Sequence, residues 1–457
     1  MARSGKARVA LDIVVVGAGL AGMATAFSLS RAGHRVVVIE KSDGKARSYG
    51  SVVSSPNMTR IIQSWGVQDE LDRMAVLFNR IHHYEAETGV FLGALTQGIL
   101  DEIKKDAVHG FAIFPYGELL DLFHQLASKK GTKFRFNETV VSLEPDTPCV
   151  ILESGERVCA DLIVGADGFH STIRSYVADG AQELESDARV VQLRTTIPLA
   201  KIREDRDFDD IGGPLDWDWW LGNGYICHCS VTQTQDQDMT VVIVHPYHEI
   251  ATSENKEWHR TQKVENYGVS MDKMEPRLRK LVGMADSFAV RVYESPAVLE
   301  SLVGPSSKVI LVGEAAHHSM PSGYHLTAMG IEDAQTLGRL FSRIQRKDQI
   351  GQIATAYDEI RQPRAEFIHH YEKQYQTVLR VPKGPVQVVR DTCLQKLSEF
   401  APGNAADEEM ILQMWGGELQ IITHDATEKV DDWWSQYGTF IWRASMPPPA
   451  DGDTRAT

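Results

Sequence analysis

A glycine-rich turn near the start of the chain constrains the fold more than any other feature. The motif Gly17–Gly22 (GAGLAG) follows a short apolar run over residues 12–16 and opens a stretch of helical spacing over 23–32. A second apolar run follows over 35–39. This order of strand, turn, helix and strand is a βαβ unit of about thirty residues. We therefore expect a parallel sheet with helices packed against it.

The spacing of the glycines, and the acidic residue that follows them, predict a dinucleotide site. Gly17 permits the tight turn, Gly19 lets a pyrophosphate approach the backbone, and Gly22 lets helix and strand pack closely. The helix N-terminus adds N–H donors and the positive end of a dipole. Glu40 ends the next strand, where a carboxylate would accept hydrogen bonds from a ribose. The alternative is a purely structural glycine turn, and this unit alone does not separate FAD from NAD.

Two later segments repeat the combination of an apolar strand and a glycine-containing turn. Residues 157–164 lead into the turn 165–168 (GADG), and residues 308–312 lead into 313–316 (GEAA). Three separate apolar strands thus end in such a turn.

The stretch between the last two turns differs in pattern. Alternating runs at 190–197, 224–232 and 239–245 predict a mostly antiparallel sheet inserted into the parallel-sheet domain. Beyond about residue 330 the pattern becomes helical, over 331–344 and 353–379, with a less regular end.

Composition disfavours several classes of protein. A net charge of −15, from 62 acidic and 47 basic side chains, leaves no excess of cations for a nucleic-acid partner and indicates acidic solubility. The five cysteines are few and odd in number, which argues against a disulfide framework and favours a reducing compartment. No run reaches the roughly 18 apolar residues of a membrane span, and glycines interrupt the first apolar run where a secretory signal would continue. We therefore expect a soluble, cytoplasmic protein with no integral membrane segment.

The second and third turns resemble two fingerprints of the flavoprotein aromatic hydroxylase family, which includes salicylate and 4-hydroxybenzoate hydroxylases and fungal natural-product monooxygenases. Residues 165–174 (GADGFHSTIR) resemble the DG fingerprint. Residues 313–317 (GEAAH), followed by Pro321 and by Glu332-Asp333-Ala334, resemble the GD fingerprint at matching spacing.

The resemblance covers roughly residues 10–380 and implies an α/β fold. This is a Rossmann-type FAD-binding domain with an inserted, mostly antiparallel substrate-binding sheet and a helical C-terminal region. Residues 49–67 are similar to the family segment that lies beneath the flavin. The expected boundaries are 10–80, 105–185 and 305–345 for the discontinuous FAD-binding domain, 186–304 for the substrate-binding sheet, 346–445 for the helical region and 446–457 for a disordered tail.

The family's activity implies an FAD-dependent monooxygenase of secondary metabolism that uses NAD(P)H and O₂ to hydroxylate or epoxidise an aromatic or electron-rich small molecule. The cofactor would carry the oxygen chemistry, while the protein positions the substrate and excludes water. Asp167 would lie near cofactor and nicotinamide, and Arg47 near the flavin unless it is a surface charge. Carried over by position, the cofactor-binding residues are Gly17, Gly19, Leu20, Ala21, Gly22, Glu40, Lys41, Arg47, Asp167, Gly313 and Glu314.

Three positions depart from the family pattern. Glu314 stands where the family has an aspartate that meets the ribityl chain, so the carboxylate is one methylene longer. Tyr324-His325-Leu326 replaces a Gly-Gln-Gly segment, which puts side chains where glycine allows close approach to the flavin ring. The segment 114–120 lacks the arginine that commonly starts a helix near the pyrophosphate. Two other functions therefore stay open: a non-redox cyclisation or isomerisation with FAD absent or structural, and a non-catalytic binding protein.

Arg194, His318 and His325 are the candidate catalytic residues. Arg194 resembles a substrate-side arginine of some fungal members and could orient an anionic or phenolic substrate, with a structural ion pair as the alternative. His317, His318 and His325 share one turn-rich segment, where each could act as a general base or line the pocket. Their spacing matches no metal-ligand pattern, so no metal site is expected.

Cysteines and tryptophans between residues 217 and 229 form a further cluster. Cys227-His228-Cys229 places both sulfurs on one face of a predicted strand, which favours a buried sheet position over a zinc site. Trp217, Trp219 and Trp220 either line the pocket of a flat substrate or pack at a loop. The expected partner is a small-molecule substrate.

Overall fold

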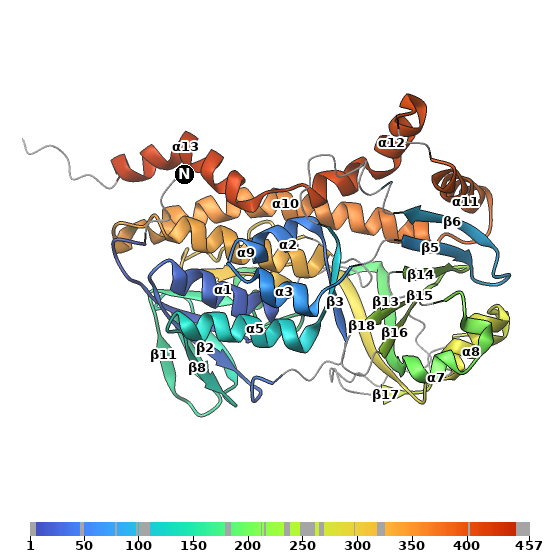
Figure 1. Cartoon of the computed structure of the whole chain (residues 1–457). Coiled ribbons are helices and arrows are strands. Elements are labelled where there is room, and N and C mark those ends of the chain that lie inside the picture. The colour runs from blue at the N-terminus through green and yellow to red at the C-terminus, as the bar shows by residue number, and fades with distance from the viewer. Residues whose placement is uncertain are drawn as a thin grey trace, which may run out of the picture.

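The computed structural model describes residues 6–45, 50–77, 80–96, 99, 110–178, 184–211, 213, 216–232, 238–246, 261–264, 269–296, 298–317, 325–400 and 403–444. Figure 1 shows two large sheets at opposite ends of the molecule, with the long helix α10 (Ile350–Leu379) running past both. This arrangement confirms the predicted α/β fold with its inserted sheet and helical C-terminal region. The tail predicted over 446–457 lies outside the described residues.

The first sheet is parallel and runs in the order β19-β12-β1-β2-β8. Helix α1 (Leu20–Arg31) connects β1 to β2, so the predicted βαβ unit is confirmed. Residues 13–16 of β1 are buried because helices cover both faces of a parallel sheet. The strands are β1 (Asp12–Val16), β2 (Arg35–Glu40), β8 (Lys133–Phe136), β12 (Leu162–Gly165) and β19 (Val309–Leu311).

The helices on this sheet include α5 (Tyr116–Lys129) and α9 (His325–Phe341), which both contact α1. A Cβ on Gly338 of α9 would lie 2.7 Å from the Ser28 Cβ of α1, so glycine is what allows these two helices to approach. The helices predicted over 331–344 and 353–379 correspond to α9 and α10, and α9 begins six residues earlier than predicted.

The strand predicted over 157–164 is wrong in its extent, because the structure divides it between two sheets. β11 (Arg157–Cys159) pairs with β10 (Cys149–Leu152) in a small sheet that also contains β9 (Val140–Glu144), whereas β12 joins the parallel sheet. The break falls at Asp161, whose carboxylate accepts hydrogen bonds from the Asp12 backbone N–H and the Lys347 ammonium. A run of apolar residues indicates that a strand is buried, but it does not indicate with which strand it pairs.

Cys149 and Cys159 lie opposite each other in β10 and β11 and form a disulfide. This pair corrects the expectation drawn from the cysteine count, since one bridge crosses the hairpin. A separation of ten residues does not reveal cross-strand register, so this pairing could not be predicted from the cysteine positions. The free cysteines among the described residues are Cys227, Cys229 and Cys393.

The second sheet is mostly antiparallel, as predicted, and runs in the order β17-β18-β13-β16-β15-β14-β5-β6. Two strands come from before residue 100, and β14 pairs with β5 in parallel. The bounds are β5 (Arg80–Glu85), β6 (Phe91–Thr96), β13 (Leu184–Pro198), β14 (Asp216–Leu221), β15 (Ile226–Thr232), β16 (Asp238–Pro246), β17 (Thr261–Gln262) and β18 (Phe288–Pro296).

The two faces of this sheet differ in character. Cys227 and Cys229 lie on one face, fully buried in an apolar cluster with Trp220, which confirms the predicted arrangement of the sulfurs. His228 and Trp219 lie on the other face, opposite each other in register. This second face packs against residues of α10 and the helices that follow it.

A fourth sheet, also small, has the order β3-β7-β4. Its strands are β3 (Ser51–Ser54), β4 (Val76–Leu77) and β7 (Ala112–Pro115). The remaining short helices are α2 (Pro56–Gln63), α3 (Gln68–Met74), α6 (Arg174–Val177), α7 (Leu199–Arg203) and α8 (Pro276–Gly283), with 3₁₀ turns at 206–208, 271–273, 313–315 and 347–349.

The C-terminal part is more regular than predicted. It forms α11 (Pro385–Ser398), α12 (Ala405–Ile422) and α13 (Ala426–Ala444), of which α13 packs on α9 and α10. Helices α11 and α12 carry little hydrophobic periodicity, whereas α13 is amphipathic. No helix among the described residues has the length and apolar character required to cross a membrane.

Candidate functional site

The glycine motif has the backbone geometry that its sequence predicts. Gly17 has a φ of +101°, and a Cβ there would lie 2.4 Å from the Ala166 carbonyl oxygen. A Cβ on Gly22 would lie 2.1 Å from the Gly17 carbonyl oxygen. Both positions therefore require glycine for the contact between loop, helix and neighbouring strand. A Cβ on Gly19, in contrast, would meet no described atom within 4 Å.

The residues around this motif take defined places. Leu20 is the buried first residue of α1. Ala21 lies against the third glycine motif, residues 313–316, because a Cβ on Gly313 would be 2.5 Å from the Ala21 Cβ. The Glu40 carboxylate accepts hydrogen bonds from the backbone N–H groups of Ala18 and Ser42, both at 2.8 Å. Lys41 follows on the surface.

Asp167 belongs to the second glycine motif, residues 165–174, and its side chain stabilises the loop that contains it. Its carboxylate accepts hydrogen bonds from Ser171 Oγ at 2.5 Å and from the backbone N–H of Thr172 at 2.7 Å. Burial raises the pKa of Asp167, and these hydrogen bonds oppose that rise. In this structure the carboxylate is committed to the turn, and its action near a nicotinamide stays a prediction.

Arg174, at the end of the second motif, connects it to the third. Its Nη1 donates to the carbonyl oxygens of Ala315 at 2.9 Å and Ala316 at 3.0 Å. Burial lowers the pKa of Arg174 to about 10. With the contacts of Gly17 to Ala166 and of Gly313 to Ala21, this places all three glycine turns against one another.

Glu314 occupies the aspartate position of the third motif and pairs with the second sheet. Glu314 Oε1 accepts a hydrogen bond from Arg291 Nη2 of β18 at 2.9 Å. Tyr116, the first residue of α5, lies nearby: burial and the charges of Glu314 and Glu40 raise its pKa to about 12. Sequence reasoning noted that the segment lacks an arginine but missed Tyr116, and it had no signal for Arg291 beyond strand alternation.

Arg194 lies on β13 of the second sheet and contacts β3 of the small β3-β7-β4 sheet. Its Nη2 donates to the Ser51 carbonyl oxygen of β3 at 3.1 Å, and its Nε has no protein partner among the described residues. Burial lowers the pKa of Arg194. A Cβ on Gly50 would lie 2.3 Å from the guanidinium, so the side chain lies against this backbone. No carboxylate in the described part of the chain forms an ion pair with Arg194, and its role in orienting a substrate stays a prediction.

Aromatic residues continue the same face of the sheet from Arg194. Trp217 Nε1 donates to His228 Nδ1 at 3.1 Å, which leaves the His228 proton on Nε2. Trp219 stacks on His228 with ring centres 4.8 Å apart. Burial, with Arg194 nearby, lowers the pKa of His228 to about 3, so the ring is neutral at pH 7. The sequence suggested Trp217, Trp219 and Trp220 either as pocket lining or as packing at a loop; all three lie on strand β14, and His228 was not singled out as a partner.

His317 and His325, which the sequence placed in one segment, have different partners in the structure. His317 Nε2 lies 2.9 Å from Asp333 Oδ2 within the buried core. His325, at the start of α9, lies 3.1 Å from Glu418 Oε2 of α12. Burial alone would lower the pKa of His325, but Glu418 raises it above its ordinary value. A role for His325 as a general base stays a prediction. The predicted residues Arg47, His318 and Tyr324 lie outside the described residues.

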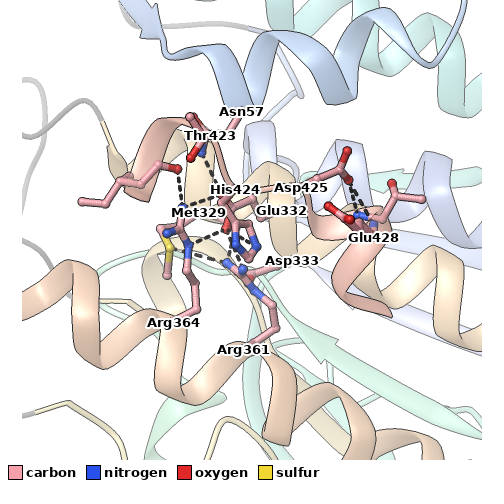
Figure 2. A network of polar contacts seen from close by, with 12 residues as sticks. Asn57, Met329, Glu332, Asp333, Arg361, Arg364, Thr423, His424, Asp425 and Glu428 are labelled. Carbon is pink, nitrogen blue, oxygen red and sulfur yellow. Dashed lines mark hydrogen bonds and ion pairs between the residues drawn. The ribbon is translucent and has the colours of Figure 1, made fainter. Parts of the chain in front are cut away.

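Figure 2 shows a network of polar contacts that includes the buried residues Glu332, Asp333, Arg361 and Arg364. Arg361 of α10 donates to Asp333 Oδ1 at 2.7 Å and Glu332 Oε2 at 2.6 Å, and all three side chains are fully buried. Asp333 also accepts from the Gly313 backbone N–H at 2.9 Å. Arg364 donates to Glu332 Oε1 at 3.0 Å. Through these contacts α9 and α10 hold the backbone of the third glycine turn, residues 313–316.

These features fit the FAD that the sequence resemblance implies. The first turn of α1 has no side-chain cap in the described structure, and Gly19 leaves room in front of it, as a pyrophosphate requires. Glu40 has carboxylate lone pairs beyond its two backbone hydrogen bonds for ribose hydroxyls. The three turns meet at one place, and the contact between Glu314 and Arg291 joins them to the sheet face that carries Arg194.

Known proteins resemble this chain over most of its length. A family model described as "FAD binding domain" matches residues 10–370. The "FAD-dependent monooxygenase atnJ" of Arthrinium sp is 24% identical over 406 residues, covering 87% of this chain and 91% of that protein. The "Hispidin-3-hydroxylase" of Neonothopanus nambi is 27% identical over 400 residues, covering 81% and 90%.

A solved structure shares the fold. The crystal structure of CtdE in complex with FAD and substrate 4 superposes with a TM-score of 0.74 at 18% identity, covering 95% of this chain and all of that one. The family match spans more than three quarters of the sequence and contains all three glycine turns. The chain therefore belongs to the FAD-binding family of flavoprotein hydroxylases.

Proposed function

We propose that this protein is an FAD-dependent monooxygenase that uses NAD(P)H and O₂ to hydroxylate or epoxidise an aromatic or otherwise electron-rich small molecule. The observation that carries the proposal is the meeting of three glycine turns, which the Arg291–Glu314 contact joins to a sheet face on which the buried Arg194 has no carboxylate partner in the described structure. A cofactor bound at the turns and a substrate held by Arg194 would then lie close to each other.

Gly17, Gly19 and Gly22 would hold the pyrophosphate with the start of α1, and Glu40 the adenosine ribose. Glu314, Gly313 and Asp167 would border the ribityl chain and ring. The bound flavin would supply the redox and oxygen chemistry. The protein's own work is to position both molecules and to keep water away from them.

The sheet face that carries Arg194 has hydrogen-bond donors among aromatic side chains and would contact the substrate. Arg194 Nε, the Nε2 of neutral His228 and the Trp219 indole N–H are donors, and Arg194 Nε and Trp219 Nε1 have no partner in the described chain. Since indole and guanidinium groups cannot accept hydrogen bonds, this face suits a flat substrate with oxygen acceptors. The cation would stabilise an anionic oxygen, such as that of a phenolate or enolate.

The visible absorption spectrum of the purified protein tests the proposal. We expect flavin bands, either as isolated or after FAD is added and the excess removed. The bands should bleach with NADH or NADPH under argon and return in air. A colourless protein that cannot be reconstituted with FAD would instead support the non-redox alternative, a cyclisation or isomerisation on the same fold.

Arg194→Met is expected to impair substrate use but not flavin binding. Loss of the charge-assisted hydrogen bond should raise KM by about 10- to 100-fold, because such contacts contribute roughly 1.5–3 kcal/mol. The Kd for FAD should change by less than about 3-fold, since Arg194 contacts none of the glycine turns in the described structure. Steady-state kinetics and an FAD titration measure the two quantities. Arg206→Met, on an exposed turn of the same sheet domain, is the control. An unchanged KM in the Arg194 variant would remove Arg194 from the substrate site.

A further inference from the structure

Arg291 joins the second sheet to the third cofactor motif. Its Nη2 donates to Glu314 Oε1 at 2.9 Å, and the two side chains are only 15% and 27% exposed. Arg291 lies on β18, directly opposite Gln192 of β13 and on the same face as Arg194. The ion pair therefore crosses from the substrate-binding sheet to the loop that carries the family's acidic position.

Two aromatic rings hold the Arg291 guanidinium in place. Its central carbon lies 4.1 Å from the ring centre of Tyr293 and 5.4 Å from that of Phe169. Phe169 belongs to the second motif, and Tyr293 donates its hydroxyl proton to Gln192 Oε1 at 3.3 Å. A planar guanidinium packed against aromatic rings gains cation–π attraction and loses less side-chain freedom than lysine would. Arg291 thus contacts both the second and the third motif.

The length of the Glu314 side chain matters for this contact. Glu314 Oε2 lies 3.8 Å from the Cβ position of Gly168, so the carboxylate extends between the second motif and Arg291. An aspartate would withdraw the carboxylate by about 1.5 Å, one carbon–carbon bond, and the 2.9 Å hydrogen bond would open. The replacement of aspartate by glutamate and the presence of Arg291 are therefore two parts of one arrangement.

We propose that Arg291 is a positioning residue that holds the Glu314 carboxylate for the cofactor, and that this partner is why the acidic position is a glutamate. The inference rests on the proposed function, because it presumes that FAD binds beside this loop. Arg291 also neutralises a carboxylate that would otherwise face an anionic cofactor at short range in a partly buried site. Loss of Arg291 should weaken FAD binding and make the flavin midpoint potential more negative.

A double-mutant cycle on the apoprotein tests the pairing. FAD is titrated into the wild type, Arg291→Met, Glu314→Asp and the double variant, and Kd is read from quenching of flavin fluorescence. We expect each single variant to bind FAD about 10-fold more weakly, as loss of a partly buried charge-assisted hydrogen bond would do. The double variant should also lose about 10-fold, not the roughly 100-fold of two independent effects. Arg291→Lys should restore part of the affinity, and part of the shift in potential.

Arg80→Met is the matched control. Arg80 donates to both oxygens of Asp216, at 2.8 and 3.0 Å, within the same sheet but between β5 and β14, away from the glycine turns. Its removal should leave the Kd for FAD and the flavin potential unchanged. The thermal midpoint of each apoprotein shows whether a variant is folded during the titration.

The outcomes separate this inference from the proposed function. A wild type that binds FAD, together with an Arg291→Met variant of equal affinity and potential, would overturn the role of Arg291 and leave the monooxygenase proposal intact. Independent, multiplying losses in the double variant would overturn the pairing with Glu314. A reduced thermal midpoint with unchanged FAD affinity would show a structural ion pair and also refute the inference. A wild type that does not bind FAD would overturn both.

Discussion

Replacing Gly19 by alanine and then by valine is expected to weaken FAD binding by about 10-fold and about 100-fold, with little change in the fold of the apoprotein. A side chain at Gly19 meets no described protein atom within 4 Å, and its φ of −71° suits any residue. The added carbons would instead occupy the space that the pyrophosphate requires, and overpacking of this kind costs roughly 1–3 kcal/mol. FAD titration gives the Kd, and thermal unfolding of the apoprotein gives its stability.

Two other glycines make the result specific. Gly416→Ala on α12 also adds a Cβ that meets no described atom within 4 Å, so FAD affinity should be unchanged. Gly22→Ala should lower both FAD affinity and apoprotein stability, because its Cβ would lie 2.1 Å from the Gly17 carbonyl oxygen. If Gly19→Val binds FAD as tightly as the wild type, the cofactor does not approach this turn and the predicted role of Gly19 is wrong.

Arg361→Met is expected to lower the free energy of unfolding by about 3–5 kcal/mol, the usual cost of leaving buried carboxylates without their cation. Arg361 donates to both Glu332 and Asp333, and all three side chains are fully buried. Because Asp333 also accepts from the Gly313 N–H, the variant should lose FAD affinity as well. Denaturant unfolding at pH 7 measures the stability. Arg346→Met, which removes an exposed pair with Asp348, should cost less than about 1 kcal/mol.

The pH dependence of the same variant provides a second test. Burial alone would raise the pKa of Glu332, but Arg364, His424 and Arg361 hold it well below its usual range; the pKa of Asp333 is likewise lowered, against burial, by His317 and Arg361. Carboxyls with depressed folded-state pKa values stabilise the fold above their unfolded pKa, about 4, and that stability disappears as pH falls through the folded value. The deficit of Arg361→Met should therefore shrink below about pH 4. A deficit that is constant from pH 7 to pH 3 would show that lost packing, not charge, is the cause.

The elements that follow from local pattern agree with the sequence. The βαβ unit, the strands of the inserted sheet and the helices α9 and α10 are set by hydrophobic period and by the backbone freedom of glycine, both of which can be read within about fifteen residues. The three glycine turns carried enough local information to identify the family. Their individual contacts with FAD stay predictions, as do the domain boundaries.

Partners that are distant in the chain could not be read in this way. The run over 157–164 divides between two sheets, β5 and β6 join the inserted sheet, and Cys149 meets Cys159 only because their strands pair in register. His325 was predicted to lie beside the flavin, but its Nε2 contacts Glu418 Oε2 of α12, a helix that was not predicted from the sequence. Each result depends on which surfaces come together. A hydrophobic pattern indicates that a residue is buried, but it does not indicate which residues pack against it.

The sequence by itself determined the kind of protein: a parallel cofactor domain with an inserted sheet, a dinucleotide turn and the residue types of a flavin site. Tertiary structure alone decided how the altered acidic position is accommodated. Glu314 forms an ion pair with Arg291, which lies 23 residues earlier on a strand, and the Phe169 ring packs against the same guanidinium. The physical reason is one of range. Backbone conformation follows from neighbouring side chains, whereas the partner of a charge is fixed only when packing brings separate elements within about 3 Å of each other.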